Sequence, residues 1–152
     1  MFHIALFEPE IAGNAGNVAR SCLAAGAALH LIRPLGFRLS DEAVRRAGMD
    51  YWDEVDLTLH PSFTAFREVF ATSFEENRVF SFSTKSTQPY TEVVYRTEDV
   101  LLFGPESRGL PEAIREQTAQ VRIPMRSAAR SLNLSVSVGV ALFEAWRQRG
   151  FE

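Results

Sequence analysis

Short apolar runs alternate along the chain with segments of helical spacing and with turn residues. The runs are rich in Val, Ile, Leu and Phe, and several end at Gly or Pro, which is typical of buried strands. The pattern predicts strands at residues 3–8, 29–34, 55–59, 78–84, 99–104 and 121–125.

The segments between these runs predict helices. Residues 11–25 are rich in alanine and stop before Gly26, which would end a helix in the left-handed conformation. Shorter helices are predicted at 40–48 with Ser40 as N-cap, at 62–71, and from Pro111, where the missing N–H costs nothing. Because strands alternate with helices, we predict an α/β protein, a mostly parallel sheet flanked by helices in one domain over residues 1–152.

The last segment gives conflicting signals. From Leu132 to Val140, apolar and small residues alternate as in a strand, whereas the spacing from there to Trp146 is helical. We predict one helix, since the order of elements requires a helix here. Its apolar residues lie nearly all round the axis, so we expect burial on more than one side and therefore a partner subunit.

The charge pattern is unusual in its choice of cation. The net charge of −3 argues against a general polyanion binder, but of 16 basic residues only Lys85 is a lysine. Arginine suits phosphates and base edges, although genome composition explains the count equally well. Two arginine clusters could bind RNA or could simply be solvated faces. They are Arg38, Arg45 and Arg46, and Arg122, Arg126 and Arg130.

Cysteine and histidine usage favours the cytoplasm. The one cysteine, Cys22, cannot form an internal disulfide, which fits a reducing compartment. His3, His30 and His60 share no metal-ligand spacing with one another or with Cys22, so we expect no metal. The apolar stretches are too short to span a membrane, and the first residues lack the basic start of a signal peptide. We therefore expect a cytoplasmic protein that does not enter a membrane.

Three loops that follow predicted strands contain the candidate functional residues. In a parallel sheet such loops gather at the carboxyl ends of the strands, where ligands bind. None of them contains the dinucleotide-binding G-x-G-x-x-G or a P-loop, and neither Ser131 nor Ser135 has the G-x-S-x-G setting of a hydrolase. The loops are PEIAGNAGNVAR, FGPESRGLP and IPMRSAARSLNLS.

Taken together and in this order, the loops resemble the three motifs of SPOUT-superfamily 2′-O-ribose methyltransferases. The resemblance covers nearly the whole chain, and its additional segments are similar to the TrmL type, which modifies cytidine or uridine at the wobble position of tRNA. It implies an S-adenosylmethionine cofactor, a tRNA substrate, a homodimer and a C-terminal trefoil knot. The motif residues are 14–20, 102–111 and 123–135, and the additional segments are 34–37, 45–52 and 144–148.

The resemblance also implies roles for individual residues. Arg20 would lie beside the target ribose, either as a clamp that stabilises the developing alkoxide or as a general base. Asn17 would hold the first loop near the substrate, and Glu106 would orient Arg20 or that loop. Ser131 and Asn133 would position cofactor and nucleotide. The implied cofactor pocket comprises Phe82, Ser83, Gly104, Glu106, Gly109, Ile123, Met125, Ser131 and Leu132. The arginines expected at the RNA are Arg20, Arg45, Arg46, Arg126 and Arg130.

Other readings of the same residues stay open. The same fold could methylate another tRNA position or ribosomal RNA, for which an N-terminal RNA-binding extension is usual. A module that binds an adenosyl ligand or RNA without chemistry is a further alternative. Leucine tRNAs would fit the family. Cys22, Tyr51, Trp52 and Trp146 are expected to be packing residues.

Overall fold

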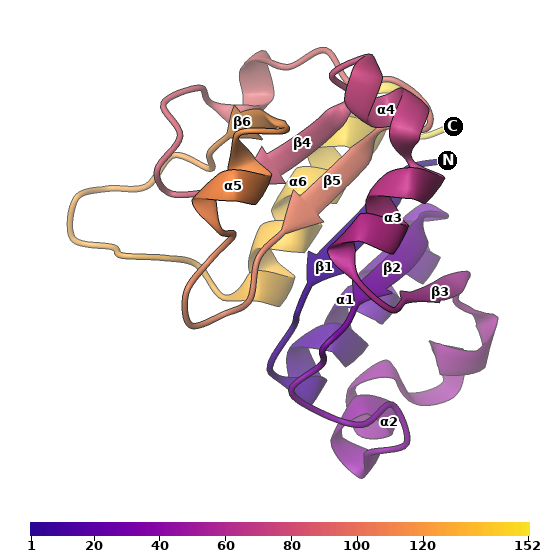
Figure 1. The fold of residues 1–152 in the computed structure, drawn as a ribbon. Helices are drawn as coiled ribbons and strands as arrows, with labels where there is room; N and C mark the ends of the chain where they lie inside the picture. Colours follow the sequence, from indigo (N-terminus) through magenta and orange to yellow (C-terminus); the bar gives the residue numbers. More distant parts are fainter.

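A computed structural model shows a parallel sheet with helices on both faces (Figure 1). It describes the backbone of residues 1–152 and the side chains of all but residues 47–51. The strand order is β3-β2-β1-β5-β4-β6, and all neighbours are parallel, which confirms the predicted α/β class. The trefoil knot stays a prediction. The strands are β1 His3–Phe7, β2 Ala28–Ile32, β3 Leu57–His60, β4 Val79–Phe82, β5 Val100–Phe103 and β6 Ala119–Val121.

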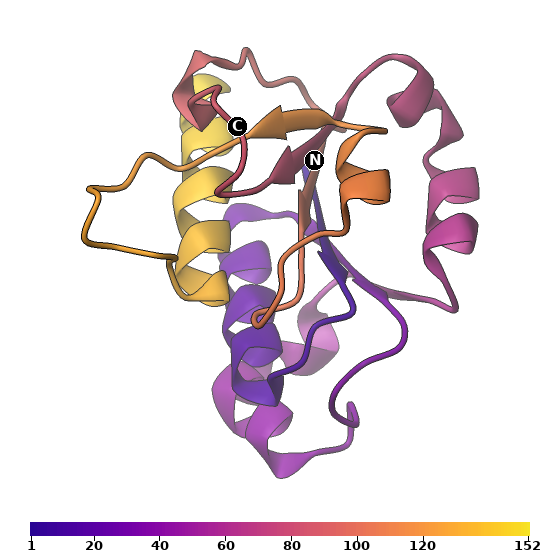
Figure 2. The same ribbon diagram turned by 60° about the vertical axis from the view of Figure 1, so that its left-hand side comes forward.

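The helices form two layers around the sheet (Figure 2). Helices α1 and α6 cover one face, and α3, α4 and α5 cover the other. In β1, Ile4 packs toward the first layer and Ala5 toward the second, so the central strand is buried on both sides. The helices are α1 Ala12–Ala25, α2 Glu42–Gly48, α3 Phe63–Val69, α4 Ala71–Glu75, α5 Glu112–Arg115 and α6 Leu134–Gln148, with 3-10 turns at Met49–Glu54 and Tyr90–Glu92.

Several predicted boundaries are wrong. Strands β2 and β4 end two residues earlier than predicted, at Ile32 and Phe82. The sixth strand ends at Val121, because its last ladder partner is Phe82 at the end of β4, and Pro124 cannot donate to a ladder. Residues 122–133 therefore form a long loop. Helix α2 begins at Glu42, so Asp41 rather than Ser40 stands in the N-cap position.

The predictions for the two long helices are confirmed. Gly26 ends α1 in the left-handed conformation, with φ of 66°. The segment with conflicting signals is one helix, α6, which begins after Asn133. The side-chain oxygen of Asn133 accepts hydrogen bonds from the backbone N–H groups of Ser135 and Val136, at 2.9 and 3.4 Å.

A row of three histidines crosses the sheet on the side of α3 and α4. His3 Nδ1 lies 3.0 Å from His30 Nε2, and His30 Nδ1 lies 3.0 Å from His60 Nε2. At the His3 end of the row, Oε2 of Glu98 lies 2.9 Å from His3 Nε2. The ring of Phe66 packs edge-on against His60. Burial, helped by the neighbouring imidazoles, lowers the pKa of His30 to about 3, and burial also lowers the pKa of His60.

This row predicts a loss of stability in weak acid. The unfolded chain binds a proton at His30 below pH about 6.5, whereas the folded chain does so only near its lowered pKa. The free energy of unfolding should therefore fall by about 2 kcal/mol between pH 7.5 and 5.0 from His30 alone. Urea unfolding at both pH values measures the difference. Glu10 and Glu98 also have lowered pKa values, but as carboxylates they lose stabilisation only below pH about 4.5.

His30→Gln is the matched variant, since an amide can both donate to and accept from the two neighbouring imidazoles. Its unfolding free energy should depend much less on pH across this window. An unchanged pH dependence would show that the row does not cause the acid sensitivity.

Candidate active site

The loop that follows β5 closes tightly on itself. A Cβ atom placed on Gly104 would lie 2.3 Å from the backbone nitrogen of Leu110 and 2.5 Å from the carbonyl carbon of Gly109. Gly109 itself has a left-handed φ of 68°, and its N–H donates to the carbonyl oxygen of Pro105 at 3.0 Å. The two glycines are thus needed for different reasons, a close backbone approach and a left-handed turn.

Glu106, in the same loop, holds the start of α1. Its carboxylate accepts hydrogen bonds from the backbone N–H groups of Glu10 at 2.8 Å and Ile11 at 3.1 Å, and from Asn14 Nδ2 at 3.3 Å. Ile11 stands in the N-cap position of α1 and has no side chain that could cap. The distant carboxylate supplies the negative charge that favours a helix N-terminus. The predicted role of Glu106 in orienting the first loop fits this geometry.

The loop after β1 also contacts the loop after β5 through its own side chains. The Glu10 carboxylate accepts from the Ser107 N–H at 2.9 Å and from its hydroxyl at 2.7 Å, and these bonds lower the pKa of Glu10. Arg108 pairs with Glu8 at 3.2 Å. Two carboxylates and one ion pair therefore join the loops after β1 and β5.

Asn14 extends this connection to the third loop. Its side-chain oxygen accepts from Asn133 Nδ2 at 3.1 Å, while Asn133 caps α6 through its own oxygen. Glu106, Asn14 and Asn133 thus form a hydrogen-bonded chain through all three motif loops, and Asn14 at its centre is buried. From the sequence, Asn14 and Asn17 could both be simple caps, and Asn17 was the better functional candidate; in the structure Asn17 is exposed on α1 and Asn14 makes the connection. The signal for Asn14 in the sequence was its place as the first asparagine of the N-x-G-N motif.

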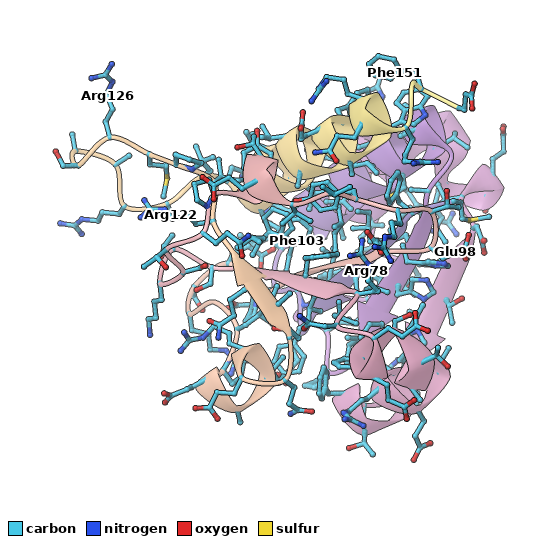
Figure 3. The ribbon with its side chains drawn as sticks, turned by 90° about the horizontal axis from the view of Figure 1, so that it is seen from above. Arg78, Glu98, Phe103, Arg122, Arg126 and Phe151 are labelled. Atoms are coloured by element: carbon cyan, nitrogen blue, oxygen red, sulfur yellow. The ribbon has the colours of Figure 1, made fainter. Side chains whose placement is uncertain are left out.

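The three loops border a pocket of about 460 Å³, within the usual range of small-molecule sites. The stacked rings of Phe82 and Phe103, with centroids 4.6 Å apart, line it at the carboxyl ends of β4 and β5; Figure 3 shows Phe103 inside the fold. Every residue predicted to contact the cofactor lines this pocket, and their role as contacts stays a prediction. They are Phe82, Ser83, Gly104, Glu106, Gly109, Ile123, Met125, Ser131 and Leu132.

The arginines predicted to bind RNA lie outside this pocket, in two places. Arg20 is exposed on α1, and Arg45 and Arg46 are exposed on the adjacent α2. Arg126 and Arg130 are exposed on the loop 122–133, and Figure 3 shows Arg126 projecting away from the body of the protein. A single chain therefore does not gather all of its predicted RNA-binding arginines around the pocket.

The remaining predictions concern packing residues. Cys22 is buried in the core, and burial raises the pKa of its thiol, so it is not poised as a nucleophile. Trp52 and Trp146 pack against the core as predicted, whereas the side chain of Tyr51 lies outside the described residues.

The described residues show neither a metal site nor a membrane-spanning helix. No group of His, Cys, Asp and Glu side chains outside residues 47–51 could hold a metal ion. Within the described part of the chain, no helix has the length and apolar character needed to cross a membrane.

Comparison with known proteins extends the sequence resemblance. The tRNA (cytidine(34)-2′-O)-methyltransferase of Yersinia pestis is 45% identical over 155 residues, which cover 99% of this chain and 96% of the relative. The enzyme of the same name from Escherichia coli K12 is 43% identical over 154 residues, covering 99% and 96%.

Solved structures show the same relationship. One concerns the 2-OH methylation of C/U34 on tRNA; it is 52% identical with a TM-score of 0.94 and covers 100% of this chain and 98% of its own. An AdoMet-bound rRNA methyltransferase from Sinorhizobium meliloti is 28% identical with a TM-score of 0.81, covering 96% of this chain and 56% of its own.

A family model spans all three motif loops. The model of the SpoU rRNA Methylase family matches residues 1–143, which include every residue of the pocket. The predictions of the family and of a methyltransferase are thereby confirmed. With full-length relatives above 40% identity, this match shows that the chain belongs to the SpoU methylase family.

Proposed function

We propose that this protein methylates the 2′-hydroxyl of the wobble nucleotide of tRNA, cytidine or uridine 34, with S-adenosylmethionine as methyl donor. The observation that carries the proposal is the pocket enclosed by the three motif loops, which Glu106, Asn14 and Asn133 tie together. Relatives that align along their full length bear the name of this activity. A tRNA-modifying role also supports the expected place in the cytoplasm.

The pocket fits an adenosyl ligand. Phe82, Ile123 and Leu132 offer apolar surface for the flat base, and the tight turn at Gly104 brings backbone groups to the wall for its polar edges. When bound, S-adenosylmethionine supplies a methyl group on a sulfonium that is already activated for transfer. The chain's part is to hold donor and hydroxyl in line.

Three residues act by positioning. Glu106 fixes the start of α1, Asn14 links it to the third loop, and Asn133 caps α6 beside the pocket. They hold the loop that faces the substrate in a fixed position relative to the loops that face the cofactor.

Arg20 has a different role in the proposal. A guanidinium stays protonated at any physiological pH and is a poor base. We therefore assign Arg20 as a clamp on a phosphate of the target, whose charge also stabilises the alkoxide that develops as the hydroxyl loses its proton.

We further propose a homodimer built on the outer face of α6. Val136, Val140 and Phe143 are 51%, 37% and 41% exposed, although Val138 and Leu142 on the opposite face are fully buried. Their spacing places the three exposed side chains on one stripe of the helix. A second copy that covers this stripe would bring its Arg20 toward the pocket, which Arg20 does not line in its own chain.

Val140→Arg tests the dimer. The charged side chain should leave the protein monomeric in light scattering at micromolar concentration and should abolish methyl transfer. Val94→Arg is the control, since Val94 is 75% exposed and lies outside α6, and it should stay dimeric and active. A fully active Val140→Arg monomer would end the dimer proposal.

Labelled methyl transfer to total tRNA, followed by mapping of the modified nucleotide, tests the function. Label at nucleotide 34 supports it, and purified leucine isoacceptors show whether they are the substrates. Label elsewhere in tRNA or in ribosomal RNA would favour the alternative targets. Cofactor binding without transfer to any RNA would indicate a binding module.

A further inference from the structure

A second hollow lies at the same edge of the sheet as the active-site pocket. The segment after β2, together with Pro61 after β3, encloses about 510 Å³. Leu35 and Leu39 form its apolar floor against the core, and Phe37 is half-buried in its wall. The active-site pocket lies at the carboxyl ends of β4 and β5, and this hollow lies at those of β2 and β3, where ligands of parallel sheets bind.

Two arginines give this hollow, which we call the Arg33 pocket, its charge. Arg33 and Arg38 both line it and are exposed. Among the described side chains, neither guanidinium has an ion pair. The nearby carboxylates are already engaged, since Asp41 accepts from the backbone N–H of Arg38 and Glu42 pairs with Arg46, both at 2.8 Å. The pocket therefore offers two forked cations above an apolar floor.

The Arg33 pocket is fastened to the active site. The Gly36 N–H donates to the Pro9 carbonyl oxygen at 2.9 Å, and a Cβ on Gly36 would lie only 2.7 Å from the Glu10 carbonyl oxygen. Glu10 in turn donates its own N–H to Glu106. One short stretch, residues 9–10, thus contacts Gly36, within the segment that lines the Arg33 pocket, and the loop that shapes the active-site pocket. A short hydrogen-bonded path therefore connects the two hollows.

We infer that the Arg33 pocket holds a second nucleotide of the same RNA, with its base against Phe37 and its phosphates on Arg33 and Arg38. Guanidinium forks match phosphate oxygens, and an aromatic ring beside a basic groove stacks an unpaired base whatever its identity. A free anion would not need the apolar floor. The inference rests on the proposed function, because it takes the RNA to be the substrate whose target nucleotide is at the active site.

Salt dependence of tRNA binding separates the two contacts. Arg33→Ala/Arg38→Ala should weaken binding, and the slope of log K against log salt should become shallower by about 1.4, or 0.7 per lost phosphate contact on a single strand. Phe37→Ala should weaken binding about 5- to 160-fold with the slope unchanged. Phe37→Tyr keeps an aromatic ring and should bind like wild type, and normal binding of S-adenosylmethionine by Phe37→Ala excludes a folding defect as the cause.

The control for charge is Arg96→Ala/Arg149→Ala. Both residues are exposed; Arg96 precedes β5, and Arg149 follows α6 near the chain termini (Figure 1). This variant should bind tRNA like wild type, and all variants should bind S-adenosylmethionine normally. If wild type methylates tRNA but the Arg33/Arg38 variant keeps its affinity and salt slope, the Arg33 pocket is not an RNA site and the proposed function stands. If wild type binds no RNA, both proposals fail.

Discussion

Gly104→Val is expected to abolish the binding of S-adenosylmethionine. The first atom of any side chain at this position would lie 2.3 Å from the backbone nitrogen of Leu110, and a rotamer change cannot relieve a clash with backbone. The loop must open, which removes a wall of the pocket, and affinity should fall about 100-fold or more. Calorimetric titration with S-adenosylmethionine or S-adenosylhomocysteine measures the loss.

Gly13→Ala provides the comparison, since a Cβ on Gly13 meets no atom within 4 Å although α1 borders the same pocket. This variant should titrate like wild type. Circular dichroism of the Gly104 variant should remain that of a folded protein, because the clash is confined to the loop. A normal titration by Gly104→Val would remove the loop after β5 from the cofactor site.

Arg20→Ala is expected to keep fold and cofactor affinity but to lose methyl transfer by 10²–10³-fold, about 2.7–4 kcal/mol, by analogy with the loss of one oxyanion donor. Arg20→Lys should rescue poorly, since an ammonium cannot reproduce the planar fork. Single-turnover methyl transfer with saturating cofactor gives the rate of the chemical step. Arg149→Ala, also exposed, should retain the wild-type rate. Near wild-type turnover by Arg20→Ala would refute the assignment.

Mixing two inactive variants shows which pocket Arg20 serves. A heterodimer of Arg20→Ala and Gly104→Val has one intact pocket and one intact Arg20, on different subunits. If Arg20 acts across the interface, a random mixture should regain about a quarter of wild-type activity, because half of the dimers have one working site of two. No recovery would mean that Arg20 acts within its own chain.

The sequence predicted those features that depend on neighbours along the chain. The strands followed from short apolar runs bounded by turn residues, and the end of α1 followed from Gly26, because local chemistry decides both. The residues around the active-site pocket followed from a resemblance whose motifs lie in three loops, together with the rule that such loops meet at one edge of a parallel sheet.

Features that depend on spatial neighbours were missed. Asn14 and Asn133 are 119 residues apart in the chain, so nothing local shows that one amide binds the other. The histidines are separated by 27 and 30 residues and meet only because the strand register aligns them. The sixth strand was placed too late, because its end is set by the length of its partner β4 rather than by its own apolar residues.

The chain of Glu106, Asn14 and Asn133 has a thermodynamic consequence for the order of binding. It spans loops that we assign to different ligands, since Asn133 caps the helix beside the cofactor pocket and Asn14 belongs to the substrate loop. A ligand that immobilises one end lowers the conformational entropy that the other end still has to lose. Bound S-adenosylmethionine should therefore raise the affinity for RNA, and bound RNA should raise the affinity for S-adenosylmethionine. The two factors must be equal, because the free energy of forming the ternary complex does not depend on which ligand binds first.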